Sequence, residues 1–221
     1  MTDLDDATLR TVVCFGDSNT HGWERTVGRL GRDARWPGVL RLELGLGWDV
    51  IEDGLGGRTA GADDPYSEFR DGRQQILPCL WAHAPVDLVA IMLGTNDLKE
   101  TFHLSAVDIS RAINLHVELA LRSLSGPDST SPRVLLIAPA PLGTRETIPE
   151  SSGLADAIAE SRRLAPLYRE VAAGAGVDFL DAGEVAAVSP LDGIHLDAAG
   201  HRALGLAVAE RVRAMFGPAG D

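Results

Sequence analysis

Features typical of secreted proteins, membrane-spanning proteins and proteins with metal clusters are scarce in this sequence. Cysteine occurs twice among 221 residues, as Cys14 and Cys79, and two distant thiols indicate a reduced compartment and no metal cluster. No apolar run approaches the ~20 residues that cross a bilayer. Residues 1–10 have neither a basic start nor an apolar core, so we expect a mobile tail and no secretory signal. These absences predict a cytoplasmic protein.

Positive charge is also in short supply. Lysine and arginine together number 20 against 32 acidic residues, and the formal net charge is −12. An acidic surface attracts neither nucleic acid nor an anionic membrane, so we expect neither as a partner. A small neutral substrate is compatible with this charge.

Patterns that bind metals or nucleotides are missing as well. The six histidines form no His-Glu-x-x-His pair, and Asp63 beside Asp64 is a weak metal signal, so no metal is predicted. The glycine-dense turn at residues 54–59 has Thr59 where the dinucleotide fingerprint needs a glycine. We therefore expect no cofactor. A nucleotide- or flavin-binding module on a flavodoxin-like sheet remains an alternative interpretation of the sequence.

Strand and helix patterns alternate along the chain. Short apolar runs predict five strands, at residues 11–15, 48–52, 87–93, 134–138 and 177–180. Apolar residues at helical spacing predict five helices, at residues 36–45, 72–83, 105–124 and 154–173 and after an N-cap at Asp197. The alternation predicts a flavodoxin-like three-layer α/β/α sandwich with a five-stranded parallel sheet.

This sandwich is expected to fill a single domain, residues 11–216, followed by a short tail at 217–221. Residues 21–35 and 139–153 show no regular pattern, and we expect both to be loops. The second is long for a connection, so it is expected to form part of the rim of a site.

Polar residues follow several of the predicted strands. Ser18 follows the first strand, the turn 54–59 follows the second and Asn96 follows the third, while Asp192 and His195 precede the last helix. Each alone is explained more simply as a cap, a bend or a turn residue. Together they supply a nucleophile, a base with an orienting carboxylate, and donors for a developing oxyanion, which acyl transfer requires.

These segments resemble the blocks of the SGNH (GDSL-type) hydrolases. Gly16-Asp-Ser-Asn is similar to the first block, with Asn19 where leucine is usual, and Gly57 lies in the counterpart of the second. Gly94-Thr-Asn-Asp resembles the third block and Asp192-Gly-Ile-His the fifth. The chain is also similar to a bacterial branch of aryl esterases that transfer acyl groups to alcohols in water. That branch more often has an aromatic residue, such as tryptophan, where His21 stands.

The resemblance implies a mechanism and assigns its residues. Ser18 would be the nucleophile, His195 the base and Asp192 its orienting carboxylate. The oxyanion would be held by the N–H groups of Ser18 and Gly57 and by the side chain of Asn96. The expected activity is hydrolysis of short-chain aryl or alkyl esters through an acyl-enzyme on Ser18. The alternative is acyl transfer to an alcohol.

A second group of residues is predicted from sequence proximity to line the pocket. Its members are Asp17, Asn19, His21, Trp23 and Ile194. We expect Arg58 to hold its loop in place, and His201 to be a surface or packing residue of the last helix. Because relatives of this branch are often oligomeric, the resemblance also implies a homo-oligomer.

Overall fold

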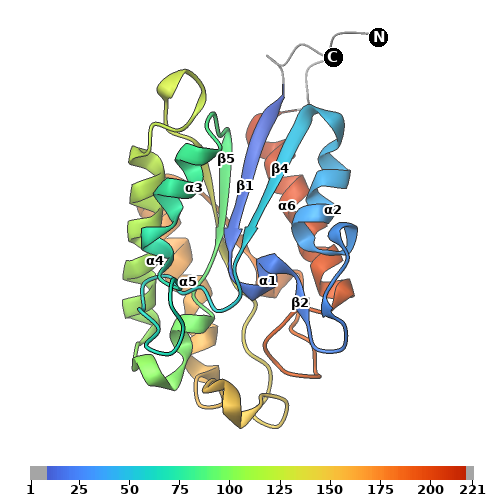
Figure 1. Ribbon diagram of the computed structural model, residues 1–221, viewed down its shortest axis with the longest axis vertical. Coiled ribbons are helices and arrows are strands. Elements are labelled where there is room, and N and C mark those ends of the chain that lie inside the picture. The colour runs from blue at the N-terminus through green and yellow to red at the C-terminus, as the bar shows by residue number, and fades with distance from the viewer. Residues whose placement is uncertain (1–8, 218–221) are drawn as a thin grey trace.

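The five predicted strands form one parallel sheet (Figure 1). In the order β4-β1-β5-β6-β7, its strands are Trp48–Gly54, Arg10–Gly16, Leu88–Met92, Arg133–Ala138 and Asp178–Asp181. Numbered along the chain, these five strands follow the order 2-1-3-4-5, which is that of flavodoxin-like sheets. The predicted fold is therefore confirmed.

Residues 9–217 are the part of the chain that this computed structural model describes. Residues 1–8 and 218–221 of the two predicted tails lie outside it. The tail boundary at residue 10 is wrong, because Arg10 pairs with Trp48 as the first residue of β1. Within the described residues, no helix is long and apolar enough to cross a membrane.

Helices cover both faces of the sheet (Figure 1). Helices α2 (Trp36–Leu44) and α6 (Ala198–Phe216) pack together on one face, and α3 (Ile76–Ala82), α4 (Ala106–Arg122) and α5 (Ile158–Ala175) lie on the other. A strand between two such layers buries both sets of its alternating side chains. All five residues of β5 are accordingly buried, which explains its uninterrupted apolar sequence.

Strand β1 shows how the two cores are divided. Val13 and Phe15 face the core beneath α3, α4 and α5, whereas Val12 and Cys14 face the core beneath α2 and α6. The predicted N-cap of α6 is present, since the Asp197 carboxylate accepts a hydrogen bond from the Gly200 N–H at 2.8 Å. The same helix packs through a buried stripe that includes Leu204, Val208 and Val212. His201 is buried as well, and its Nδ1 accepts from the Trp36 N–H at 3.3 Å, so it is a packing residue.

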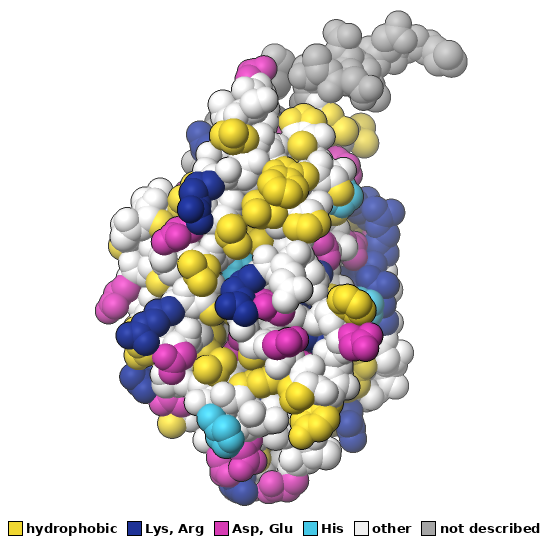
Figure 2. All heavy atoms as spheres, turned by 60° about the vertical axis from the view of Figure 1, so that its left-hand side comes forward, with side chains coloured by type: hydrophobic (Ala, Val, Ile, Leu, Met, Phe, Trp, Pro, Cys, Tyr) yellow, Lys and Arg dark blue, Asp and Glu magenta, His cyan; other side chains and the backbone are white. Residues whose placement is uncertain are grey.

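The face of the molecule shown in Figure 2 carries charges of both signs mixed together. Acidic, basic and hydrophobic side chains are interspersed over the face to which α4 belongs (Figure 2). On α4 itself, Arg111 pairs with Asp108 and Arg122 pairs with Glu118, three and four residues apart on the exposed side. Such spacings are the usual ones for ion pairs on a solvent-facing helix.

The predicted loop 21–35 contains regular structure that the sequence pattern did not reveal. Strands β2 (Trp23–Glu24) and β3 (Gly28–Arg29) form a small antiparallel hairpin. The Glu24 carboxylate closes its turn by accepting from the backbone N–H groups of Thr26 and Val27 at 2.9 and 3.1 Å. Strands of two residues are too short to show an alternating pattern, so the prediction of a plain loop is wrong here.

Other boundaries differ by a few residues. A 3₁₀ turn at Gly72–Gln74 precedes α3, and α5 begins at Ile158 rather than at residue 154. The loop 139–153 contains a single 3₁₀ turn, Glu150–Ser152. Helix ends of this kind depend on tertiary contacts, which sequence periodicity does not report.

Strands β1, β4 and β5 of the main sheet end at the same level. Gly16 of β1 pairs with Gly54 of β4 on one side and with Met92 of β5 on the other. The short helix α1 (Ser18–His21) then packs directly on the end of β4. A Cβ atom added at Gly54 would lie 2.1 Å from the backbone nitrogen of His21 and 2.5 Å from the carbonyl carbon of Thr20.

We expect Gly54→Ala to destabilise the protein by about 1–3 kcal/mol, because the backbone of α1 must move to admit the methyl group. Gly56→Ala is the matched control, since a Cβ atom there meets no atom within 4 Å. The control should change stability by less than about 0.5 kcal/mol. Urea unfolding followed by circular dichroism measures both, and equal stability of the two variants would contradict the packing described.

Candidate active site

Ser18 stands at the point where β1 turns into α1. The Asp17 carboxylate caps this helix by accepting from the Asn19 N–H at 2.9 Å, and Ser18 is its first residue. The turn is tight, since a Cβ atom at Gly16 would lie 2.0 Å from Thr20 Oγ1 and 2.8 Å from the Met92 carbonyl oxygen. The N–H groups at a helix start have no partner within the helix, so they are available to a negatively charged group.

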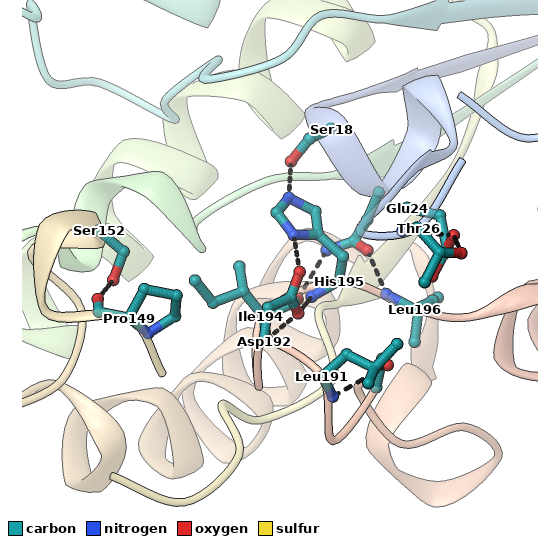
Figure 3. Close-up of polar contacts among 12 residues, drawn as sticks. Ser18, Glu24, Thr26, Pro149, Ser152, Leu191, Asp192, Ile194, His195 and Leu196 are labelled. Carbon is teal, nitrogen blue, oxygen red and sulfur yellow. Dashed lines mark hydrogen bonds and ion pairs between the residues drawn. The ribbon is translucent and has the colours of Figure 1, made fainter. Parts of the chain in front are cut away.

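A chain of hydrogen bonds joins Ser18, His195 and Asp192 (Figure 3). Ser18 Oγ is 3.0 Å from His195 Nε2, and His195 Nδ1 is 2.9 Å from Asp192 Oδ2. A carboxylate can only accept, so it selects the tautomer in which Nδ1 carries the proton. Nε2 is then free to accept the hydroxyl proton of Ser18.

Asp192 is held as an ionised acceptor although it is 2% exposed. Burial by itself would raise the pKa of this carboxyl, but the hydrogen bonds from the His195 ring and from the backbone N–H groups of His195 and Ile194 lower it below its usual value. Since Oδ1 takes both backbone bonds, Oδ2 is left for the imidazole. The carboxylate therefore fixes both the charge and the direction of the ring.

The turn after β4 lies beside Ser18. The Leu55 N–H donates to the Gly16 carbonyl at 3.0 Å, and Asn96 Nδ2 donates to the Arg58 carbonyl at 3.0 Å. Gly57 lies between these two anchored residues with φ +79°, a value that favours glycine. The structure thus brings the predicted donors from three separate turns to one edge of the sheet.

Arg58 is a larger part of this assembly than the sequence indicated. Its guanidinium is buried, donates to the Gly16 and Asp53 carbonyl oxygens at 2.9 and 2.6 Å, and pairs with Asp53 Oδ1 at 2.8 Å. The same group lies 4.1 Å over the Phe15 ring. The Arg58 side chain therefore joins the ends of β1 and β4 to the turn at residues 54–59. From the sequence alone, it is expected only to hold its own loop in place.

Two other residues were missed as parts of the site's frame. Asp97 accepts from the N–H groups of Ala60 and Gly61 at 2.7 and 3.0 Å, which connects the third turn to the second. Tyr168 on α5 donates its hydroxyl to the Leu93 carbonyl at 3.0 Å, just before the Asn96 turn. The Asn-Asp pair was a sequence signal for Asp97, whereas nothing in the spacing pointed to Tyr168.

The loop 139–153 lies against the segment that carries the Asp192–His195 pair. The Gly143 N–H donates to the Gly193 carbonyl at 2.8 Å, and the Glu100 N–H donates to the Gly153 carbonyl at 2.8 Å. Gly193 itself has φ +64°, and a Cβ atom there would lie 2.5 Å from Thr147 Oγ1. The loop therefore extends from the segment that follows Asn96 to the segment that carries Asp192 and His195, as expected for the rim of a site.

The five predicted pocket residues fall into two groups. Trp23 lies beside the Asp192–His195 pair, since its ring centroid is 4.3 Å from that of the His195 ring. His21 is partly exposed at the end of α1. Burial, followed by the charge of Arg29, lowers the pKa of His21. Asp17, Asn19 and Ile194 are buried and make hydrogen bonds within the frame.

Metal ligands do not gather at this edge. Across residues 9–217, no group of three or more histidine, cysteine, aspartate or glutamate side chains could hold a metal ion.

The chain matches the model of the GDSL-like lipase/acylhydrolase family over residues 14–203. It belongs to this family. The sequence prediction of an SGNH (GDSL-type) ester hydrolase is thus confirmed at the level of the family. No curated protein matches the chain.

Solved structures of esterases are similar to this GDSL-like hydrolase over nearly all of its length. The native aryl esterase of M. smegmatis is 37% identical with a TM-score of 0.87, over 94% of this chain and 100% of that one. Est24, a carbohydrate acetylesterase from Sinorhizobium meliloti, is 36% identical with a TM-score of 0.87, again over 94% and 100%. A carbohydrate acetylesterase family member from the same organism is 39% identical with a TM-score of 0.88, over 95% and 100%.

Buried ionisable groups give this hydrolase opposing pH responses. Burial raises the pKa of Asp17 and of Asp97 from 3.8 to about 6, and it lowers the pKa of His116 and of His201 from 6.5 to about 4. The folded state therefore binds the carboxyl protons more tightly than the unfolded state does, and stability from the two aspartates falls as pH rises from about 4 to 6. Stability from the two histidines rises over a similar range.

We expect Asp17→Asn to isolate one of these contributions, because asparagine still accepts from the Asn19 N–H but does not ionise. The stability of the variant relative to wild type should improve by about 3 kcal/mol between pH 3.5 and pH 7. Urea unfolding at the two pH values measures this difference. The exposed Asp49→Asn is the control, and parallel pH profiles for Asp17→Asn and wild type would contradict the expectation.

Proposed function

We propose that this protein cleaves short-chain carboxylic esters through an acyl-enzyme on Ser18. The observation that carries the proposal is the continuous hydrogen-bond chain from Ser18 Oγ through His195 to Asp192, with distances of 3.0 and 2.9 Å. Because His195 Nδ1 carries the proton that is shared with Asp192, Nε2 of the same ring is free to act as a base toward the Ser18 hydroxyl. A nucleophile, a base and an orienting group in this order are the requirements of covalent acyl transfer.

In the first step, Ser18 Oγ attacks the ester carbonyl while His195 Nε2 takes the hydroxyl proton. The imidazolium that forms is stabilised by the Asp192 carboxylate, which stays ionised because three donors point at it. The carbonyl oxygen becomes negatively charged as the new C–O bond forms. It needs donors that are already in place.

Three groups at the sheet edge are the proposed donors. They are the Ser18 N–H at the start of α1, the Gly57 N–H and the second N–H of the Asn96 amide. The first N–H of that amide donates to the Arg58 carbonyl at 3.0 Å, which fixes the amide beside the Gly57 turn. Donors held in this way need little rearrangement when the charge develops.

The tetrahedral intermediate then collapses. The ester C–O bond breaks, His195 Nε2 returns its proton to the departing alcohol, and the acyl group stays on Ser18. Water enters on the same side, gives a proton to Nε2 and attacks the acyl carbon. Breakdown by the reverse proton path releases the acid and restores the Ser18 hydroxyl.

The substrate is proposed to carry a short acyl group, in keeping with the aryl and acetyl esterases that the fold resembles. The Trp23 ring lies beside His195 and the loop 139–153 lies against Gly193, so both occupy space beside the segment that carries the base. The Trp23 ring also presents apolar surface next to the base. An alcohol acceptor would gain from this contact, which supports acyl transfer as the second candidate.

Ser18→Ala and His195→Ala should each remove nearly all hydrolysis of a p-nitrophenyl acetate, because the three residues act as a unit. Ser151→Ala, an exposed serine on the rim loop, is the control. A fluorophosphonate should label wild type on Ser18 and leave Ser18→Ala unlabelled. Turnover by Ser18→Ala at the wild-type rate would overturn the proposal.

Adding an alcohol to the wild-type assay tests the second candidate function, acyl transfer. That function is excluded if no new ester forms at any alcohol concentration.

Asn96→Ala should lower kcat by about 10²- to 10³-fold, since it removes one oxyanion donor. KM should change little, because the donor acts mainly on the charge of the transition state. Steady-state kinetics on the same ester separates the two parameters. Asn114→Ala, on the exposed side of α4, is the control, and a loss confined to KM would contradict the assigned role.

A further inference from the structure

The side chain of Asn19 holds the backbone on both sides of His195. Its Nδ2 donates to the Ile194 carbonyl at 3.3 Å, and its Oδ1 accepts from the Leu196 N–H at 2.9 Å. Figure 3 shows these two partners, Ile194 and Leu196, on either side of His195. A single amide thus satisfies the peptide groups immediately before and after the residue that carries the imidazole. Asn19 is next to Ser18 in sequence, whereas Ile194 and Leu196 lie 175 and 177 residues away.

Both ends of this clamp are themselves fixed. The Asn19 N–H donates to Asp17 Oδ1 at 2.9 Å, which ties the residue to the start of α1. On the other side, the His195 N–H donates to Asp192 Oδ1 at 2.9 Å, and the His195 carbonyl accepts from the Ser189 N–H at 2.7 Å. The Asn19 amide connects these two local networks directly.

Asn19 is committed to this frame and not to the substrate. Its side chain was expected to line the pocket, yet the residue is 5% exposed and both ends of its amide are bonded to backbone. Leucine, the usual residue at this position of the resembled family, has the same branched arrangement of four side-chain heavy atoms and could make neither bond. The chain therefore contains a polar contact at a position where the family usually has an apolar side chain.

The contact bears on the geometry of proton transfer. Ser18 Oγ and His195 Nε2 are 3.0 Å apart, and a general base must stay within about 2.6–3.2 Å of the atom it deprotonates. A displacement of about 1 Å costs on the order of 100-fold in rate. We propose that Asn19 is a positioning residue, which binds the His195 backbone to the helix of Ser18 and keeps Nε2 within reach of Oγ. This inference rests on the proposed serine mechanism.

Asn19→Leu tests the clamp, because it keeps the branched heavy-atom skeleton of the side chain and removes both hydrogen bonds. We expect kcat for a p-nitrophenyl ester to fall about 10- to 100-fold. KM should stay within about threefold of wild type, since the binding surface is unchanged. Asn114→Leu on α4 is the matched control and should leave both parameters unchanged. All variants are assayed at a temperature at which circular dichroism shows them to be folded.

Asn19→Asp supplies a readout that packing alone would not move. Its carboxylate accepts from the Leu196 N–H but places a second acceptor opposite the Ile194 carbonyl, whereas its protonated form has an O–H to donate there. The ratio of kcat for Asn19→Asp to kcat for wild type should therefore rise as pH falls from 8 to 5.5. The corresponding ratio for Asn19→Leu should stay constant, because leucine does not titrate.

The outcomes separate this inference from the function on which it rests. Wild-type hydrolysis by Ser18→Ala would overturn both. An inactive Ser18→Ala combined with a wild-type kcat in Asn19→Leu would overturn the clamp alone, as would a loss confined to KM. If Asn19→Leu does not fold, Asn19→Asp decides: a rising ratio supports the clamp, and a constant ratio overturns it.

Discussion

Strands β1, β4 and β5 end at one level of the sheet, because Gly16 pairs with Gly54 on one side and with Met92 on the other. This register is the constraint on which the site depends. It places the turns that follow the three strands side by side, so residues far apart in sequence share one edge. In a sheet of this order the direction of strand addition switches between β1 and β5, which is where ligands bind at the carboxyl ends. Ser18 follows β1 and Asn96 follows β5, one on each side of this point.

Charged side chains that are buried then hold these turns together. Arg58 joins β1 and β4 through the Gly16 and Asp53 carbonyl groups, and Asp97 joins the second and third turns through Ala60 and Gly61. A buried charge is costly unless its hydrogen bonds are satisfied, so each of these groups favours one arrangement of the backbone around it. Such rigidity suits a site whose donors must be in place before charge develops.

The sequence allowed the sheet, its order of helices and the Ser18, Asp192 and His195 group to be predicted, because each depends on local apolar pattern or on short motifs. The hairpin at Trp23–Arg29 escaped prediction since two-residue strands have no period, and Tyr168 escaped it since its contact with Leu93 joins α5 to the end of β5. The amide of Asn19 was assigned to the pocket for a related reason. Its partners lie at the other end of the chain, where no local pattern records them.

The separation of Ser18 and His195 by 177 residues has a consequence for the protein's synthesis. A nascent chain exposes its serine early, but under the proposed mechanism that hydroxyl has no base until the segment before α6 has left the ribosome and docked. Ester cleavage by that mechanism therefore requires residues 192–195 to have been synthesised and docked beside α1. The total activity of a sample would then be proportional to the number of chains in which these two distant segments have come together.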